Sequence, residues 1–161
     1  MQRTNLGDMN CSVAQCLAVV GEWWSLLILR DAFLGVTRFD HFQARLGIAR
    51  NILTERLNRL VEDGLLKRVP YEDHPPRSEY RLTPKGSDLW HVMTAMRQWG
   101  DRWAAPNGPP LKIRHTGCGR VVQVVPVCSH CGERLDVRSV TAIAGPGALE
   151  ADFDHTALAH R

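Results

Sequence analysis

A pair of amphipathic segments separated by glycine is the feature that most constrains the fold of this chain. The first segment begins at Thr37 to Asp40, whose Ser/Thr-x-x-Asp/Glu spacing predicts a capped helix start, and it stops at Gly47. The second runs from about Ala49 to Asp63 and is closed by Gly64. Its apolar residues recur every three or four positions and form one core-facing stripe: Leu53, Leu57, Leu60 and Val61. Two short helices joined by a glycine-containing turn predict a helix-turn-helix.

A β-hairpin is expected directly after this pair. Leu65 to Tyr71 has the character of a strand, Glu79 to Leu82 alternates as its partner, and Glu72 to Ser78 forms a polar, proline-rich tip. A helix-turn-helix followed by such a hairpin is a winged helix. Thr83 caps the next helix, and Pro84 occupies its first turn, where a missing N–H costs nothing. Part of this helix's broad apolar stripe is a candidate dimer interface: Leu89, Val92, Met93, Met96, Trp99 and Trp103.

Two further helices are predicted before the helix-turn-helix. Cys11 to Val20 forms the first, with Asn10 as its N-cap, and Trp24 to Leu34 forms the second, ending at Gly35. The fold class is therefore mostly α with a small β-hairpin wing. No run of about 18 apolar residues occurs, and the polar start lacks the features of a signal peptide. We therefore expect a cytoplasmic protein without a membrane segment.

Short polar side chains on the outer side of the 49–63 helix are suited to reading base edges. Asn51, Thr54 and Asn58 can reach the major groove, where asparagine pairs bidentately with adenine. Glu55 and Glu62 lie on the same face, where a carboxylate can accept a hydrogen bond from cytosine, or can repel phosphate and hold Arg59 through a helical pair. Only Glu55 is retained as a predicted DNA contact.

Basic side chains around this helix are the predicted backbone contacts. Arg45, Arg50 and Lys67 or Arg68 can reach phosphates, and Arg77 at the hairpin tip can enter a minor groove. Arg59, on the flank of the polar face, is a further predicted DNA contact. The alternative is that these charges only solvate a helix surface. A formal net charge of +3 permits nucleic-acid binding without arguing for it.

These motifs together resemble the HxlR family of winged-helix transcription regulators, which are relatives of the MarR group. The matching residues span about Cys11 to Ala104, and they are Cys11, Gly21 to Leu29, Arg38 to Asp40, Leu53 to Leu57, Asp63 to Leu65, Tyr71, Pro76 to Tyr80, Leu82 to Gly86 and Trp99. Two places depart from the family pattern, namely Trp23 and the turn Ile48 to Asn51. The resemblance implies a homodimer built through the first and last helices, with two recognition helices roughly 34 Å apart, or a multiple of that, on double-stranded operator DNA.

An odd count of five cysteines, in a chain without an export signal, argues against a disulfide framework. Cys11 stands at a predicted helix start, where the helix dipole favours the reactive thiolate. Several members of the resembling family carry a cysteine at this position that senses oxidants or electrophiles. The alternative is a half-buried structural thiol.

A second group of cysteines follows the proline-rich linker at Pro106 to Pro110. His115-x2-Cys118 and Cys128-x2-Cys131 form two knuckles separated by nine residues, with a predicted strand at Val121 to Val125 between them. This spacing predicts a structural zinc ion in a small zinc-ribbon-like β extension, and subgroups of the resembling family carry a similar extension. The alternatives are a metal-free hairpin or a redox pair formed by Cys128 and Cys131.

The sequence therefore predicts three parts: a winged-helix DNA-binding and dimerisation domain over 11–109, a zinc-ribbon-like extension over 111–141 and a flexible tail over 142–161. Enzyme motifs are missing, and four zinc ligands leave no open catalytic position. The expected protein is a dimeric transcriptional repressor, responsive to an oxidant or a small molecule. The alternatives from other classes are a protein-interaction module and a thiol or zinc redox protein.

Overall fold

The computed structural model describes residues 5–73 and 76–149, which group into two compact units. Val19–Val122 form one unit, and Met1–Ala18 with Gln123–Arg161 form the other. Residues 74–75 of the predicted hairpin tip and 150–161 of the predicted tail lie outside the described residues. The predicted boundaries near residues 110 and 141 stay a prediction. No single described helix is long and apolar enough to cross a membrane, and the helices Ser12–Val20 and Trp23–Phe33 reach that standard only as one bent pair.

Three helices form the core of the larger unit: α2 (Trp23–Phe33), α3 (Phe39–Leu46) and α4 (Arg50–Glu62). Gly47 ends α3 in the left-handed region with φ 61°, a conformation that costs glycine least. The predicted stripe of α4 packs inward against its neighbours. The fully buried large apolar side chains of this core are Ile28, Leu29, Phe42, Leu53, Leu57, Leu60, Leu65 and Leu66. The short turn and the buried stripe confirm the predicted helix-turn-helix.

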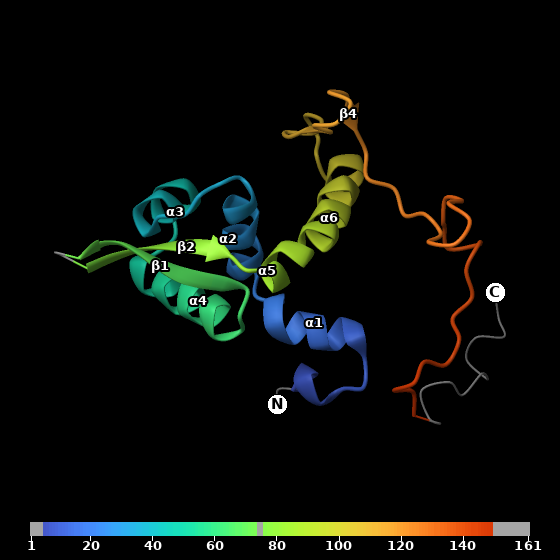
Figure 1. The fold of residues 1–161 in the computed structure, drawn as a ribbon, viewed down its shortest axis with the longest axis horizontal. Coiled ribbons are helices and arrows are strands. Elements are labelled where there is room, and N and C mark those ends of the chain that lie inside the picture. Colours follow the sequence, from blue (N-terminus) through green and yellow to red (C-terminus); the bar gives the residue numbers. More distant parts are fainter. Residues whose placement is uncertain (1–4, 74–75, 150–161) are drawn as a thin grey trace. The chain divides into compact units, whose positions relative to one another are not determined.

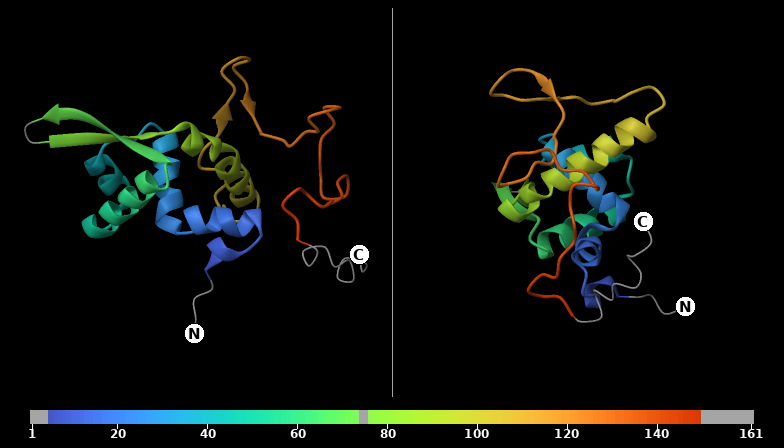
Figure 2. Two further views of the ribbon diagram at one scale, coloured as in Figure 1. Left: turned by 60° about the horizontal axis from the view of Figure 1, so that its bottom comes forward. Right: turned by 90° about the vertical axis from the view of Figure 1, so that its right-hand side faces the viewer.

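The wing is an antiparallel hairpin of β1 (Leu66–Asp73) and β2 (Pro76–Leu82) that extends past α3 and α4 (Figures 1 and 2). Both strands are longer than predicted, since we expected the tip to begin at Glu72. The register shifts between Pro70 and Glu72, which leaves Tyr71 as the extra residue of a bulge. Beyond this bulge, an ion pair of 3.4 Å between Glu72 Oε2 and Arg77 Nε joins the two strands. The predicted winged helix is thus confirmed, with a longer wing.

The predicted cap of α3 at Thr37 is wrong. The N-cap residue is Arg38, and no side chain caps the helix. The backbone before α3 is extended and pairs with the edge of β2, because the Thr37 carbonyl accepts a hydrogen bond of 2.7 Å from the Tyr80 N–H. Asp40 does not reach back to the cap and instead accepts from the His41 N–H at 3.1 Å. Sheet pairing thus replaces the expected capping box.

The segment after the wing forms two helices, α5 (Pro84–Asp88) and α6 (Trp90–Trp103), where we predicted one. The Thr83 side chain accepts from the Gly86 N–H, as predicted for the cap. Gly86 lies against the carbonyl of Leu65 so closely that a Cβ there would overlap it. This close approach places α5 on the core, and the chain changes direction at Leu89 before α6 continues.

A short hairpin of β3 (Ile113–Arg114) and β4 (Val121–Val122) ends the larger unit. The strand predicted over Val121 to Val125 is therefore shorter than expected. In the smaller unit, Val127 and Arg134 form an isolated bridge.

The N-terminal region holds a 3-10 turn, η1 (Leu6–Asp8), followed by α1 (Ser12–Val20). The predicted N-cap Asn10 is wrong, because the Cys11 carbonyl accepts the first helical hydrogen bond, 2.9 Å from the Gln15 N–H. Asn10 lies one residue too early, and its side-chain amide donates to the Gly147 carbonyl at 3.0 Å. Cys11 itself stands at the start of α1, as expected.

Candidate nucleic-acid interface

The outer face of α4 carries a row of polar side chains along an open hollow. The stripe that faces the core holds Leu53, Leu57 and Leu60, so the helical period turns the polar residues outward. The hollow is lined by Arg50, Asn51, Thr54, Glu55 and Asn58, which are five of the predicted DNA contacts. Sequence periodicity alone was enough to place them on one face.

Local contacts hold several of these side chains in place. The Arg50 guanidinium lies 5.1 Å from the centre of the Phe39 ring on α3. The Thr54 hydroxyl donates to the Arg50 carbonyl at 2.8 Å, a bond within the helix. The side-chain carbonyl of Asn58 accepts from Arg68 on β1. The end of the polar face is therefore tied to the wing, and Asn51 at its N-terminal end is exposed.

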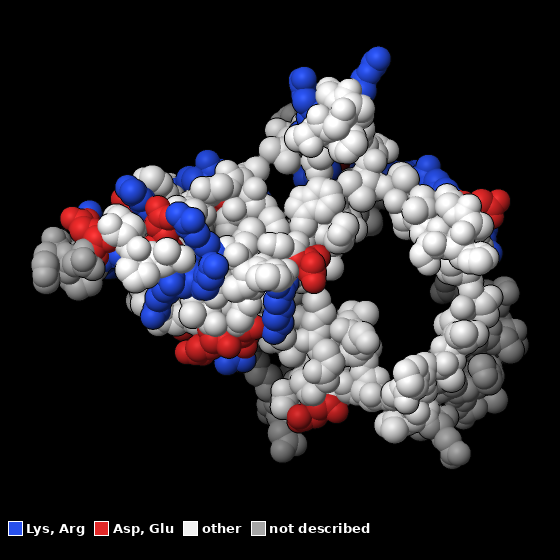
Figure 3. All heavy atoms as spheres, in the orientation of Figure 1, with Lys and Arg blue, Asp and Glu red and all other residues white. Residues whose placement is uncertain are grey.

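The wing carries three further predicted contacts at its surface. Lys67 and Arg68 are exposed neighbours on β1, and Arg68 lies 5.9 Å from the centre of the Tyr80 ring. Arg77 is exposed and paired with Glu72 near the tip. Figure 3 shows Lys and Arg side chains over the hairpin, with acidic side chains gathered beside α4. The surface is thus locally basic rather than uniformly so.

Two predicted contacts make ion pairs with neighbouring carboxylates. Arg45 Nε lies 3.2 Å from Oδ2 of Asp31, whose side chain is fully buried on α2. Arg59 Nε on α4 lies 3.0 Å from Oδ2 of Asp63, the C-cap residue of this helix, and Arg59 Nη1 lies 3.9 Å from Oε2 of Glu62. Of the two carboxylates predicted to hold Arg59, Glu62 makes this pair, whereas Glu55 pairs with Arg56 at 3.6 Å.

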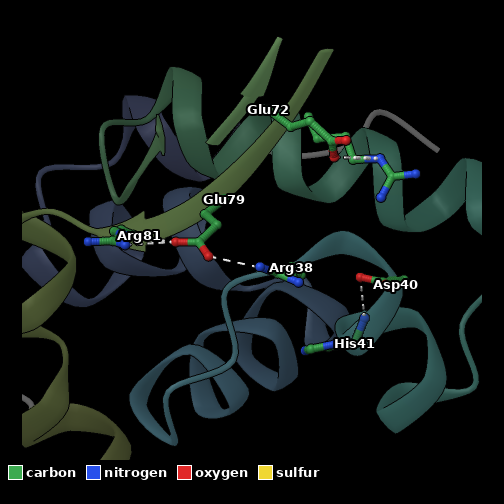
Figure 4. A network of polar contacts seen from close by, with 7 residues as sticks. Arg38, Asp40, His41, Glu72, Glu79 and Arg81 are labelled. Carbon is green, nitrogen blue, oxygen red and sulfur yellow. Dashed lines mark hydrogen bonds and ion pairs between the residues drawn. The ribbon is translucent and has the colours of Figure 1, made fainter. Parts of the chain in front are cut away.

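A cluster of two arginines around Glu79 was missed by the sequence analysis (Figure 4). Arg81 Nη2 lies 2.8 Å from one carboxylate oxygen of Glu79, and Arg38 Nε lies 3.6 Å from the other. Hydrogen bonds from Arg81 lower the pKa of Glu79 below its ordinary value, and Arg38 lowers it further. Two cations for one anion leave this side of the wing positive. The i, i+2 spacing of Glu79 and Arg81 was visible in the sequence, whereas the pairing with Arg38 depends on the unpredicted edge contact of β2.

The two predicted zinc knuckles fall in different compact units, and each is formed locally. In the larger unit, His115 Nδ1 lies 3.3 Å from Cys118 Sγ. In the smaller unit, the backbone N–H groups of Cys131 and His130, then the Cys131 thiol, lower the pKa of the Cys128 thiol. Within residues 5–73 and 76–149, no group of three or more His, Cys, Asp or Glu side chains is assembled for a metal ion.

Cys11, the predicted sensor, is exposed, and Cys16 is half-buried. Within the smaller unit, Cys11 lines an open hollow together with Gln15 and the segment Gly145 to Ala148. The thiol is therefore within reach of small reagents.

Comparison with known proteins assigns the larger unit to a family. Residues 19–108 match the family described as HxlR-like helix-turn-helix. The chain is 50% identical over 137 residues to Rv3095, an uncharacterized HTH-type transcriptional regulator of Mycobacterium tuberculosis (strain ATCC 25618 / H37Rv), and the match covers 84% of this chain and 87% of the relative. The similarity therefore extends beyond the family segment.

Solved structures give the same result. The crystal structure of PA1607, provisionally described as a transcription factor, has a TM-score of 0.77 and 39% identity, covering 88% of this chain and all of that chain. The redox regulator HypR in its oxidized form has a TM-score of 0.52 and 33% identity, covering 56% of this chain and 94% of that chain. Both similarities agree with a winged-helix fold.

Proposed function

The chain belongs to the HxlR-like helix-turn-helix family of transcription regulators, and on this premise we propose that it is a dimeric, sequence-specific repressor acting in the cytoplasm. The polar outer face of α4 supports this proposal most strongly. It presents amides, a hydroxyl and a guanidinium to solvent between the helix-turn-helix turn and a basic wing. These are the groups that read base edges and phosphates in a major groove.

Fluorescence anisotropy on DNA from the region upstream of the protein's own gene tests DNA reading. We expect tight binding at physiological salt that scrambled competitor does not displace. Replacing Arg50 and Asn51 together by Ala removes one phosphate and one base contact, so affinity is expected to fall about tenfold to a hundredfold. Arg120→Ala, an exposed cation outside the winged helix, is the matched control. Equal loss in both variants would contradict a role for α4.

Exposed apolar side chains support the proposed homodimer. On α6, Val92, Met96, Trp99 and Trp103 recur every three or four residues and are 42–65% exposed. On α1, Val13 and Leu17 form a similar pair, 67% and 46% exposed. Large apolar side chains in such rows mark an association surface. Sedimentation equilibrium is expected to give a dimer for the protein and a monomer for Trp99→Glu, and a wild-type monomer would contradict the proposal.

Structural zinc in the extension is also proposed, with His115, Cys118, Cys128 and Cys131 as ligands. The donor set fits zinc, and the lowered pKa of Cys128 favours the thiolate that binds metal. Bound zinc would supply folding energy to the extension and no open coordination position for chemistry. Elemental analysis of reduced protein is expected to find about one zinc per chain, and Cys118→Ser is expected to lose it.

An oxidant response through Cys11 completes the proposal. The exposed thiol at the start of α1 and the similarity to a structure described as a redox regulator support it. Cys11→Ser is expected to bind operator DNA as the wild type does but to keep that affinity after mild oxidation. Cys16→Ser, which changes a half-buried thiol on the same helix, is the control. A Cys11→Ser protein whose DNA affinity still changes on oxidation would contradict sensing by Cys11 and would favour a small-molecule effector.

A further inference from the structure

We propose that the larger unit binds a small, mostly apolar organic anion, such as an aromatic carboxylate, in a pocket between α2, the end of α3, α6 and residues 110–113. The pocket has a volume of about 750 Å³. Volumes of about 300–1,000 Å³ are typical for small-molecule sites. All of its lining residues belong to the unit Val19–Val122.

The walls of this pocket are apolar and come from distant parts of the sequence. Phe33 and Leu34 line it from α2, and Trp90 and Met93 line it from α6. Leu111 and Ile113 line it from the segment that follows the family-matched region 19–108. Arg97 on α6 donates to the Leu111 carbonyl at 3.1 Å, which holds this segment in place. The pocket is therefore a feature of this chain's extended form and not of the winged helix alone.

The charged side chains that line the pocket are cationic and therefore favour an anionic ligand. Arg30, Arg45, Arg97 and Lys112 all line the pocket, and among the described residues no carboxylate does. Asp101 pairs with Arg97 at 2.6 Å. The fully buried Asp31 is shared by two cations, since Arg30 Nη2 lies 2.9 Å and Arg45 Nε lies 3.2 Å from its oxygens. Two guanidiniums on one carboxylate leave a positive charge beside apolar walls, which fits a carboxylate carried on an aromatic or aliphatic body.

The proposed dimer surface leaves this pocket accessible. At about 100° per residue, Val92, Trp99 and Trp103 project from one side of α6. Trp90, Met93 and Arg97 project from a side roughly a third of a turn away. Met96 lies between the two faces and is half exposed. A ligand and a second copy of the chain can therefore use α6 at the same time.

Arg45 connects the pocket to the DNA-reading helix. It lies in the last turn of α3, two residues before the Gly47 turn that leads to α4. An anion that draws Arg45 away from Asp31 changes the contact between α2 and α3, and hence the position of α4. This regulatory consequence rests on the proposed function, whereas ligand binding does not.

Titration calorimetry with 2-naphthoate, its neutral analogue 2-naphthalenemethanol and acetate tests the pocket without DNA. We expect one naphthoate per chain, with the neutral alcohol and acetate each bound at least about tenfold more weakly. Arg45→Gln leaves Arg30 to pair with Asp31 and is expected to weaken naphthoate binding about tenfold. Leu111→Trp narrows the pocket from a half-exposed position, so it is expected to weaken binding without changing the melting temperature. Arg120→Gln should bind as the wild type does.

Absence of naphthoate binding up to millimolar concentration would overturn the proposal. Equal binding of naphthoate and the alcohol, or unchanged binding in both Arg45→Gln and Leu111→Trp, would overturn it as well. Anisotropy with operator DNA distinguishes ligand binding in the pocket from the proposed DNA-binding function. Ligand binding without any DNA binding leaves the pocket and removes the proposed function, whereas naphthoate that shifts DNA affinity in the wild type but not in Arg45→Gln supports both.

Discussion

The winged helix and the segment after it are stabilised in different ways. Every fully buried large apolar side chain of the described residues lies between Ile28 and Leu66. By contrast, no described residue from 101 to 149 is buried. A segment of that size without a core cannot offset the entropy of ordering its backbone by burial alone, and small domains of this kind usually depend on a metal or a partner. The winged helix is therefore stabilised by its own hydrophobic core, whereas the absence of buried residues in the described part of the extension is the reason that we propose a zinc ion there.

Metal removal is expected to lower stability more than any other change considered below. The loss should be confined to the extension. Structural zinc contributes on the order of 10 kcal/mol of binding free energy in small metal-dependent folds. A chelator is therefore expected to abolish hydrogen-exchange protection over residues 113–134 while protection in α4 persists. Mass-spectrometric exchange with and without chelator measures both regions in one sample. Equal protection before and after chelation would contradict the proposal that a metal ion stabilises the extension.

A matched pair of truncations sharpens the same contrast. Leu57→Ala empties a fully buried position in α4 and is expected to cost about 2–5 kcal/mol of unfolding free energy. Val137→Ala alters a residue that is 88% exposed in the extension and should cost less than about 0.5 kcal/mol. Denaturant unfolding followed by circular dichroism gives both values. Similar costs would show that the extension has a core of its own.

Loss of the α5 cap is expected to lower the stability of the winged helix by an intermediate amount. The Thr83 hydroxyl accepts from the Gly86 N–H at 3.1 Å and lies 2.6 Å from the Gly64 carbonyl, to which it donates. Thr83→Ala is expected to destabilise the protein by about 1 kcal/mol. Thermal unfolding beside Ser87→Ala, an exposed hydroxyl in the same helix, checks this value. A Thr83→Ala protein as stable as Ser87→Ala would contradict the capping role.

Protonation of Glu79 in the wing at acid pH is expected to destabilise the protein by a smaller amount. The arginines beside Glu79 lower its pKa below 4.5, so the unfolded state binds a proton more readily than the folded state. Glu79 therefore stabilises the fold above its unfolded pKa, and this contribution disappears as the pH falls through the lowered folded pKa. Melting temperatures between about pH 5 and 3 should fall less steeply for Glu79→Gln than for the wild type. The exposed Glu62→Gln serves as control, and parallel curves for all three proteins would contradict the account.

Periodic signals predicted most of the winged helix from sequence. The leucine stripe and Gly47 placed α4 to within one residue at each end, because burial of one face determines both the helix and its orientation. Contacts between distant segments were not predictable in this way. The pairing of Thr37 with Tyr80 removed the expected cap, and a turn at Leu89 divided one predicted helix into two.

The candidate site shows the same limit. Periodicity identified the polar face of α4, yet no local pattern indicated that Arg45 lies against the buried Asp31. Arg38 likewise reaches Glu79 only through the edge contact of β2. Both arginines acquire their partners from tertiary packing, which spacing along one helix does not encode.

Selection of DNA from a random library is the measurement that tests the central claim most directly, namely that two α4 helices read DNA sequence. The wild-type protein is expected to enrich two inverted half-sites whose centres lie about 10 base pairs apart, or a multiple of that. Asn51→Ala is expected to enrich the same site with relaxed preference at one position in each half. An unenriched library, or identical preference in both proteins, would contradict the claim that this face of α4 reads DNA.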